Sequence, residues 1–157
     1  MSHKPDGEWM KLAPIRVLSY DIECQGRKGI FPEAKQDPVI QIASILTEHG
    51  RTTPIDRQID VLDTCLPIIG ARVKSHSDER GLLKSWTKYV VECDPDIITG
   101  YNSNNFDMPY ILDRAQVILI LIFFEWMTEY SSTTIMLMIF SFYSMTEYLT
   151  NLMLLLI

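Results

Sequence analysis

The amino-acid composition changes abruptly after Ala115, and this change limits how much of the 157-residue chain can form an ordinary globular domain. All 14 Lys and Arg residues lie at or before Arg114. Residues 116–157 contain no Gly, Pro, Ala, Asp, His or Cys, and 28 of these 42 residues are apolar. We therefore expect a polar N-terminal segment at 1–14, one folded domain at 15–115 and an apolar tail at 116–157.

The composition of the tail leaves three interpretations open. Ile135–Ile157 is long enough to span a membrane, which takes about 20 apolar residues, but Glu147 and Asn151 interrupt it and no Lys or Arg flanks it. A buried helical hairpin is the second interpretation, although cap and turn signals are hard to find. The third is that the segment is not evolved protein sequence, because its residue types have mostly A/T-rich codons, as an intron or a shifted reading frame would give.

The net charge of −6 argues against a broad basic surface. It does not exclude nucleic acid as a ligand, because a site that holds metal ions beside phosphates is itself acidic. The three cysteines, Cys24, Cys65 and Cys93, are scattered without CxxC spacing, which predicts reduced thiols and neither a disulfide framework nor a zinc site. The N-terminal residues lack the apolar core of a secretory signal.

The apolar patterns of residues 15–115 predict strands and helices in the order strand, strand, strand, helix, strand, helix. We expect strands at 15–20, 38–47, 57–62 and 97–99, of which the last should be short and buried. The first helix should be capped by Ser77, carry an apolar stripe at 82, 83, 86 and 90, and end at 94–96, and the second should begin at Asp107. In strand 38–47, Val39, Gln41, Ala43 and Ile45 should share one face. This order predicts an α/β fold with a mixed sheet.

Two acids, Asp21 and Glu23, follow the first apolar stretch. On a strand, this spacing places both side chains on one face, about 6.6 Å apart along the strand. Like charges at such a distance repel unless a cation neutralises them, and Mg²⁺ prefers carboxylate oxygens. The alternative is that both acids are solvated on a loop just past the strand.

A second acidic motif follows strand 97–99. Gly100 allows a sharp turn, Asn102 offers a donor and an acceptor, and Phe106 offers a flat face on which a base can stack. Asp107 begins the second helix, where a carboxylate also favours the helix dipole. Since α/β sheets tend to place sites at adjacent strand ends, we expect the two motifs to converge.

These motifs and the segments between them, GRKGIFPE, DPVIQIAS and DPDIITGYN, resemble the 3′→5′ exonuclease domain of B-family DNA polymerases. Within that family the likeness is greatest to the delta type, and it covers Ile15 to Ala115. The resemblance implies a ribonuclease-H-like α/β fold, incomplete in this chain. It also implies a fragment of a replicative polymerase that acts in proofreading in the nucleus and works with other polymerase subunits.

The resemblance further implies roles for particular residues. Asp21, Glu23 and Asp107 would be catalytic, metal-binding carboxylates that hold two Mg²⁺ or Mn²⁺ ions at the single-stranded 3′ end of a DNA primer. Asn102 and Phe106 would bind and position that strand.

The chain also departs from the family pattern. The family's third exonuclease motif pairs a tyrosine with a fourth metal-binding aspartate, and this sequence has no aspartate after Asp113. The polymerase motifs and the C-terminal cysteine clusters are absent too. We therefore expect a weak nuclease that does not polymerise DNA. The alternatives are a non-catalytic remnant or mis-spliced product, and a membrane-tethered nuclease-like protein.

Overall fold

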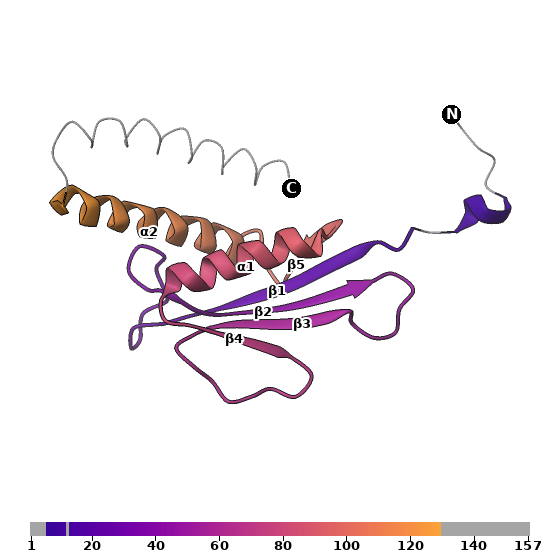
Figure 1. Ribbon diagram of the computed structural model, residues 1–157, viewed down its shortest axis with the longest axis horizontal. Coiled ribbons are helices and arrows are strands. Elements are labelled where there is room, and N and C mark those ends of the chain that lie inside the picture. Colours follow the sequence, from indigo (N-terminus) through magenta and orange to yellow (C-terminus); the bar gives the residue numbers. More distant parts are fainter. Residues whose placement is uncertain (1–5, 12, 130–157) are drawn as a thin grey trace. The chain divides into compact units, whose positions relative to one another are not determined.

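The computed structural model describes residues 6–11 and 13–129 of the chain. The chain divides into two units, Met1–Val117 and Ile118–Ile157. The elements in chain order are a 3-10 helix η1 (Gly7–Met10), strands β1 (Arg16–Cys24), β2 (Val39–Glu48), β3 (Asp56–Leu62) and β4 (Arg72–His76), helix α1 (Glu79–Cys93), strand β5 (Ile97–Thr99) and helix α2 (Asp107–Glu129), as Figure 1 shows.

The five strands form one mixed sheet in the order β4-β3-β2-β1-β5. The pairs β1–β2 and β2–β3 are antiparallel, whereas β5 runs parallel to β1 and β4 parallel to β3. The predicted α/β fold with a mixed sheet is confirmed. The sequence did not predict β4, because RVKSH has no run of apolar residues. The expected burial of β5 is wrong, because β5 lies at the sheet edge and Ile97 is 47% exposed.

Helix α1 packs against β2, β3 and β4 and buries one face of the sheet. The Trp86 ring lies 5.2 Å from the Tyr20 ring of β1, and Trp86 Nε1 donates to Ser44 Oγ at 3.1 Å. All four residues of the predicted stripe are buried: Leu82, Leu83, Trp86 and Val90. The face of β1 that carries Leu18, Tyr20 and Ile22 is therefore the core side of the sheet.

A β-bulge interrupts the expected alternation of β2 close to the first acidic motif. The pairing changes from Glu23↔Gln41 to Cys24↔Val39, so Ile40 is the extra residue. From Gln41 onward the side chains follow the predicted alternation. The prediction that Val39 shares a face with Gln41 is wrong, because the bulge shifts the alternation, and Val39 is fully buried.

The N-terminal cap of α1 is Asp78, and the prediction of Ser77 is wrong. Asp78 has an extended backbone, and its Oδ1 accepts a hydrogen bond from Gly81 N at 2.7 Å. The helix ends where predicted, because Asp94 takes the left-handed conformation with φ of 44°.

Helix α2 runs through the composition change at Ala115 and continues to Glu129, so residues 116–129 are helical. No helix within the described part of the chain is long and apolar enough to cross a membrane. The candidate membrane segment Ile135–Ile157 lies outside the described residues.

Candidate functional site

Strand β1 itself carries the first acidic pair. Asp21 and Glu23 are exposed and Ile22 between them is buried, so both acids lie on the face of β1 opposite the core. The prediction that they share a face of the strand is confirmed, and the alternative of a loop past the strand is wrong.

The edge of β1 next to these acids is not covered by β5. Strand β5 pairs with β1 only from Val17 to Ser19. Further along, the backbone N–H of Ile22 donates to Asp107 Oδ1 at 3.1 Å. The side chain of Asp107 therefore lies against the one residue that separates Asp21 from Glu23, as the predicted convergence of the two motifs requires.

Asp107 is buried, with 2% of the residue exposed, and Asp21 is among the groups that affect its pKa. Burial raises the pKa of Asp107, and the negative charge of Asp21 raises it further, whereas the N–H groups of Ile22 and of Asp107 itself lower it. The negative charge of Asp21 therefore acts on the Asp107 carboxylate, with burial as the larger cause of the raised pKa.

Cys24 lies in the same negative field. Burial is the main cause that raises its pKa to about 11, and the charges of Asp107 and Glu23 add to it. The Cys24 thiol therefore stays protonated near neutral pH, which fits a packing residue and not a nucleophile.

Gly100 makes the approach of the second motif to β1 possible. A Cβ at this position would lie 2.5 Å from the carbonyl oxygen of Tyr20 and 2.9 Å from Ser103 Cβ. The residue that turns the chain with a left-handed backbone is Asn102, with φ of 54°. Gly100 is therefore required for close packing, while Asn102 makes the turn, since Asn tolerates this conformation.

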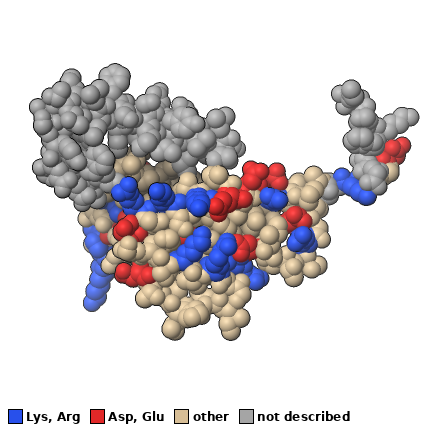
Figure 2. Space-filling view, viewed as in Figure 1, with Lys and Arg blue, Asp and Glu red and all other residues tan. Residues whose placement is uncertain are grey.

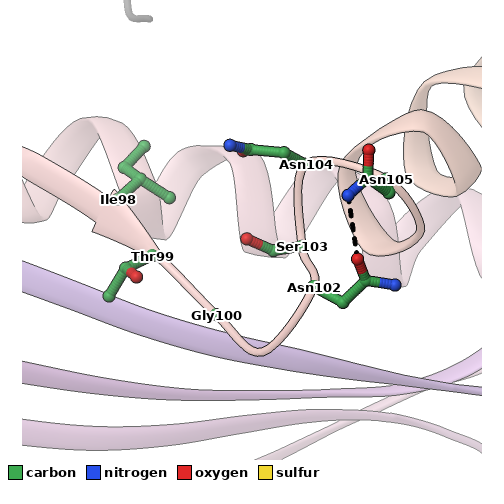
Figure 3. Close-up of a pocket in the computed structure, with 7 residues that line it drawn as sticks. All are labelled: Ile98, Thr99, Gly100, Asn102, Ser103, Asn104 and Asn105. Carbon is green, nitrogen blue, oxygen red and sulfur yellow. Dashed lines mark hydrogen bonds between the residues drawn. The ribbon is translucent and has the colours of Figure 1, made fainter.

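The loop of this motif borders an open pocket of about 220 Å³ (Figure 3). Its lining includes three amide side chains, and the Asn105 amide donates to Asn102 Oδ1 at 2.9 Å, drawn as the dashed line. This bond fixes which way the Asn102 amide points and directs its nitrogen away from Asn105. The pocket is lined by Ile98, Thr99, Gly100, Asn102, Ser103, Asn104 and Asn105.

Phe106 is half-buried between two other aromatic rings. Its ring centroid lies 5.4 Å from that of Tyr110 and 5.4 Å from that of Phe31. Phe31 belongs to the loop after β1 and was not among the predicted site residues. The signal that would have found it is a large apolar residue in an otherwise polar loop that follows an acidic motif.

Arg27, in the same loop, is held by acids within the loop. Its Nε donates to Asp37 Oδ1 at 2.9 Å and its Nη2 to Glu33 at 3.1 Å. Asp37 also accepts from Glu33 N at 2.7 Å. Arg27 therefore orders the loop.

Asp21, Glu23 and Asp107 all carry carboxylate oxygens, which are the donor type that a hard divalent cation prefers. In residues 6–11 and 13–129, however, no group of three or more His, Cys, Asp or Glu side chains is arranged to hold a metal ion. The three acids therefore do not form a complete ligand set by themselves.

Charge is mixed on the face of the molecule shown in Figure 2. Basic and acidic side chains are interspersed there, without a single broad field of either sign. On this face, binding of nucleic acid would depend on local contacts more than on overall charge.

Comparison with known proteins identifies relatives of the chain. Residues 1–146 match the family model described as DNA polymerase family B, exonuclease domain. The DNA polymerase delta catalytic subunit of Drosophila melanogaster is 57% identical over 115 residues, which are 73% of this chain and 10% of that protein. The Candida albicans subunit of the same name is 49% identical over 118 residues, 75% of this chain and 11% of that protein.

A solved structure of the family B DNA polymerase from Pyrobaculum calidifontis matches with 30% sequence identity and a TM-score of 0.47. The match covers 68% of this chain and 11% of the polymerase chain. The chain spans about a tenth of the length of the curated relatives it matches. It belongs to the exonuclease domain family of family B DNA polymerases, and the two relatives named above are delta catalytic subunits.

Proposed function

We propose that the chain carries part of a divalent-metal 3′→5′ exonuclease site that acts on the single-stranded 3′ end of DNA. The observation that supports this most is the hydrogen bond from Ile22 N to Asp107 Oδ1. It holds one acid against the strand segment that carries the other two, although 85 residues separate the bonded pair.

Asp21, Glu23 and Asp107 are the residues proposed to hold Mg²⁺ or Mn²⁺. Two bound ions would supply an activated water and stabilise the leaving 3′ oxygen of the scissile linkage. The chain's own contribution is to fix the carboxylates. Strand β1 presents Asp21 and Glu23 on one face, and the Ile22 N–H orients Asp107.

Asn102 and Phe106 are proposed to position the strand. Because Asn102 Oδ1 is occupied by Asn105, its NH₂ group is the part that can donate to a phosphate or base. Phe106 is half-buried, so part of its ring can stack on an unpaired base next to Asp107.

The proposed hydrolysis is slow in this chain, because the sequence has no aspartate after Asp113 to serve as the fourth ligand. In a protein of the relatives' length, we propose that this unit proofreads beside a polymerase site, with other polymerase subunits, in the nucleus.

The ligand arrangement favours a second candidate function, which is binding of single-stranded DNA without hydrolysis. In the part of the chain that the structure describes, no three acids form a group that could hold a metal. Such a chain would keep Asn102 and Phe106 as strand contacts but would not cleave the strand.

A single assay separates the two candidates. A 5′-labelled single strand is incubated with the chain while Mg²⁺ or Mn²⁺ is titrated. We expect slow, stepwise shortening that disappears with EDTA and with Asp107→Asn. Asp113→Asn is the matched control, because Asp113 is an exposed acid on the same helix, and it should shorten the strand as the wild type does.

Binding without shortening would support the second candidate. Absence of both binding and shortening would contradict both candidates. Fast shortening would contradict the account of an incomplete ligand set.

A further inference from the structure

A buried ion pair joins the first residue of α1 to α2. The side chains of Arg114 in α2 and Glu79 in α1 are 8% and 9% exposed. Arg114 Nε donates to Glu79 Oε1 at 2.8 Å, and Arg114 Nη2 donates to Glu79 Oε2. Two parallel bonds of this kind fix the orientation of the two groups as well as their separation.

The same two side chains also hold the loop between β1 and β2 and the start of β2. Glu79 Oε1 accepts from the backbone N–H of Val39 at 2.7 Å. Arg114 Nη1 donates to the Ala34 carbonyl at 2.9 Å. Val39 in turn pairs with Cys24, the last residue of β1. The ion pair therefore ties α2 to the end of the sheet that carries the first acidic motif.

Asp107 and Arg114 lie on the same face of α2, because seven residues make close to two turns of an α-helix. Along the helix axis the two positions are roughly 10 Å apart. The Ile22 N–H holds the helix at Asp107. Between the two positions, Tyr110 Oη donates to the Asp37 carbonyl at 2.8 Å. One hydrogen bond at Asp107 would let the helix pivot, whereas the ion pair two turns further on fixes its direction.

Stability alone does not explain why two charges are buried here. Taking each ion out of water costs on the order of several kcal/mol, and apolar side chains of similar volume often stabilise a protein equally well. An apolar pair lacks the fixed geometry of a guanidinium fork on a carboxylate. The ion pair is therefore suited to fixing the position of a neighbouring group.

We propose that Arg114 and Glu79 are positioning residues of the proposed site, and that their ion pair holds the Asp107 carboxylate against Ile22 of β1. The proposal rests on the proposed function, since it gives the pair a role at that site. The pair acts only through Asp107. When the pair is loosened, α2 can pivot, and the hydrogen bond between Ile22 and Asp107 is weakened.

The test uses the full, isotopically labelled chain in EDTA and follows hydrogen exchange of the Ile22 amide by NMR. Arg114→Lys keeps the positive charge but cannot form both bonds to Glu79. Relative to the amides of the β2–β3 ladder, we expect the Ile22 amide to exchange at least about tenfold faster in this variant than in the wild type. A purely structural role would speed exchange at Ile22 and in the ladder by the same factor.

A double variant keeps the test decisive if Arg114→Lys does not fold. Glu79→Gln combined with Arg114→Met removes both charges, and the new amide oxygen can still accept from Val39 N. Since neither charge is left unpaired, we expect the fold to persist. The Ile22 amide should lose protection selectively in this variant too.

Two controls separate positioning from general destabilisation. Arg72→Lys makes the same substitution in the ion pair of Arg72 with Asp56, and it should leave exchange at Ile22 unchanged. Val90→Ala removes a buried side chain from α1, and it should speed exchange at Ile22 and in the β2–β3 ladder by the same factor.

Mn²⁺ binding by the same proteins connects the ion pair to the proposed metal site. We expect Arg114→Lys to weaken Mn²⁺ binding by roughly tenfold, whereas Arg72→Lys should bind as the wild type does. Unchanged Mn²⁺ binding in a variant that has lost protection at Ile22 would overturn the role of the pair at the site.

The remaining outcomes separate the ion pair from the proposed function. Equal acceleration at Ile22 and in the ladder, in both variants, would overturn the proposal and leave the proposed nuclease site intact. Selective loss of protection at Ile22, without Mn²⁺ binding by the wild type, would support the hold on Asp107 and contradict the proposed metal site. Selective loss together with weakened Mn²⁺ binding would support both.

Discussion

The carboxylate of Asp107 accepts a hydrogen bond from the backbone N–H of Ile22 at 3.1 Å, on a strand edge that β5 does not reach. If β5 were longer, a backbone carbonyl of β5 would accept the hydrogen bond from this N–H, as in a regular sheet. The side chain that takes its place is an acid, and it lies within the field of Asp21. The early end of β5 is thus what allows a buried carboxylate to reach β1.

This arrangement predicts that Gly100 does not tolerate a side chain. In Gly100→Ala the new Cβ would lie 2.5 Å from the Tyr20 carbonyl oxygen, so the turn or β1 must shift. We expect a loss of roughly 1–3 kcal/mol in the free energy of unfolding, measured by urea denaturation. Gly26→Ala is the control, because its Cβ would meet Pro32 Cγ at an ordinary 3.7 Å. Equal stabilities for the two variants would contradict the close-packing role of Gly100.

The cap of α1 gives a second prediction. Asp78→Ala removes the acceptor of the Gly81 N–H, so we expect about 1 kcal/mol of destabilisation in thermal or urea unfolding. Ser77→Ala should change stability by less than about 0.5 kcal/mol, as for surface substitutions in general. A larger loss of stability in Ser77→Ala than in Asp78→Ala would contradict this assignment and support Ser77 as the cap.

The hydrogen bonds that Asp37 accepts predict that the free energy of unfolding depends on pH. The Glu33 N–H, and after it the Arg27 guanidinium, lower the pKa of Asp37. Because the pKa of Asp37 is lower in the folded state, its charged carboxylate stabilises the protein at pH values above the unfolded-state pKa of about 3.9. This stabilisation is lost as the pH falls through the folded-state pKa. Asp37→Asn should therefore be less stable than the wild type at pH 7, and the difference should shrink as the pH is lowered below about 4.

Urea unfolding of both proteins across this pH range measures the difference. Glu92→Gln, which breaks an exposed ion pair with Lys88, should have almost no effect at any pH. A difference between Asp37→Asn and the wild type that does not change with pH would show that the charge of Asp37 does not hold the loop.

Much of the fold could be predicted because its strands and helices carry strong periodic patterns. The positions of Leu82, Leu83, Trp86 and Val90 at helical spacing predicted the buried stripe of α1. The expected strand at 97–99 matches β5, although it is an exposed edge strand. Strand β4 could not be predicted, since an edge strand needs only backbone pairing with β3 and RVKSH carries no apolar alternation.

The site was predictable in outline but not in its contacts. The spacing of Asp21 and Glu23 predicted their shared face, because strand geometry depends only on sequence separation. The bond from Ile22 to Asp107, the packing of Phe31 on Phe106 and the bulge at Ile40 depend on tertiary structure. Local sequence carries no record of such contacts, so they required the structure.

The measurement that tests the central claim most directly is Mn²⁺ binding, followed by electron paramagnetic resonance as free Mn²⁺ disappears. If Asp21 and Asp107 bind the ion together, Asp21→Asn and Asp107→Asn should each weaken Mn²⁺ binding by at least about tenfold, whereas Asp113→Asn should bind as the wild type does. Asp107→Asn keeps an oxygen acceptor for the Ile22 N–H, so the fold should persist. Undiminished Mn²⁺ binding in both Asp21→Asn and Asp107→Asn would contradict the claim that these acids form a metal site.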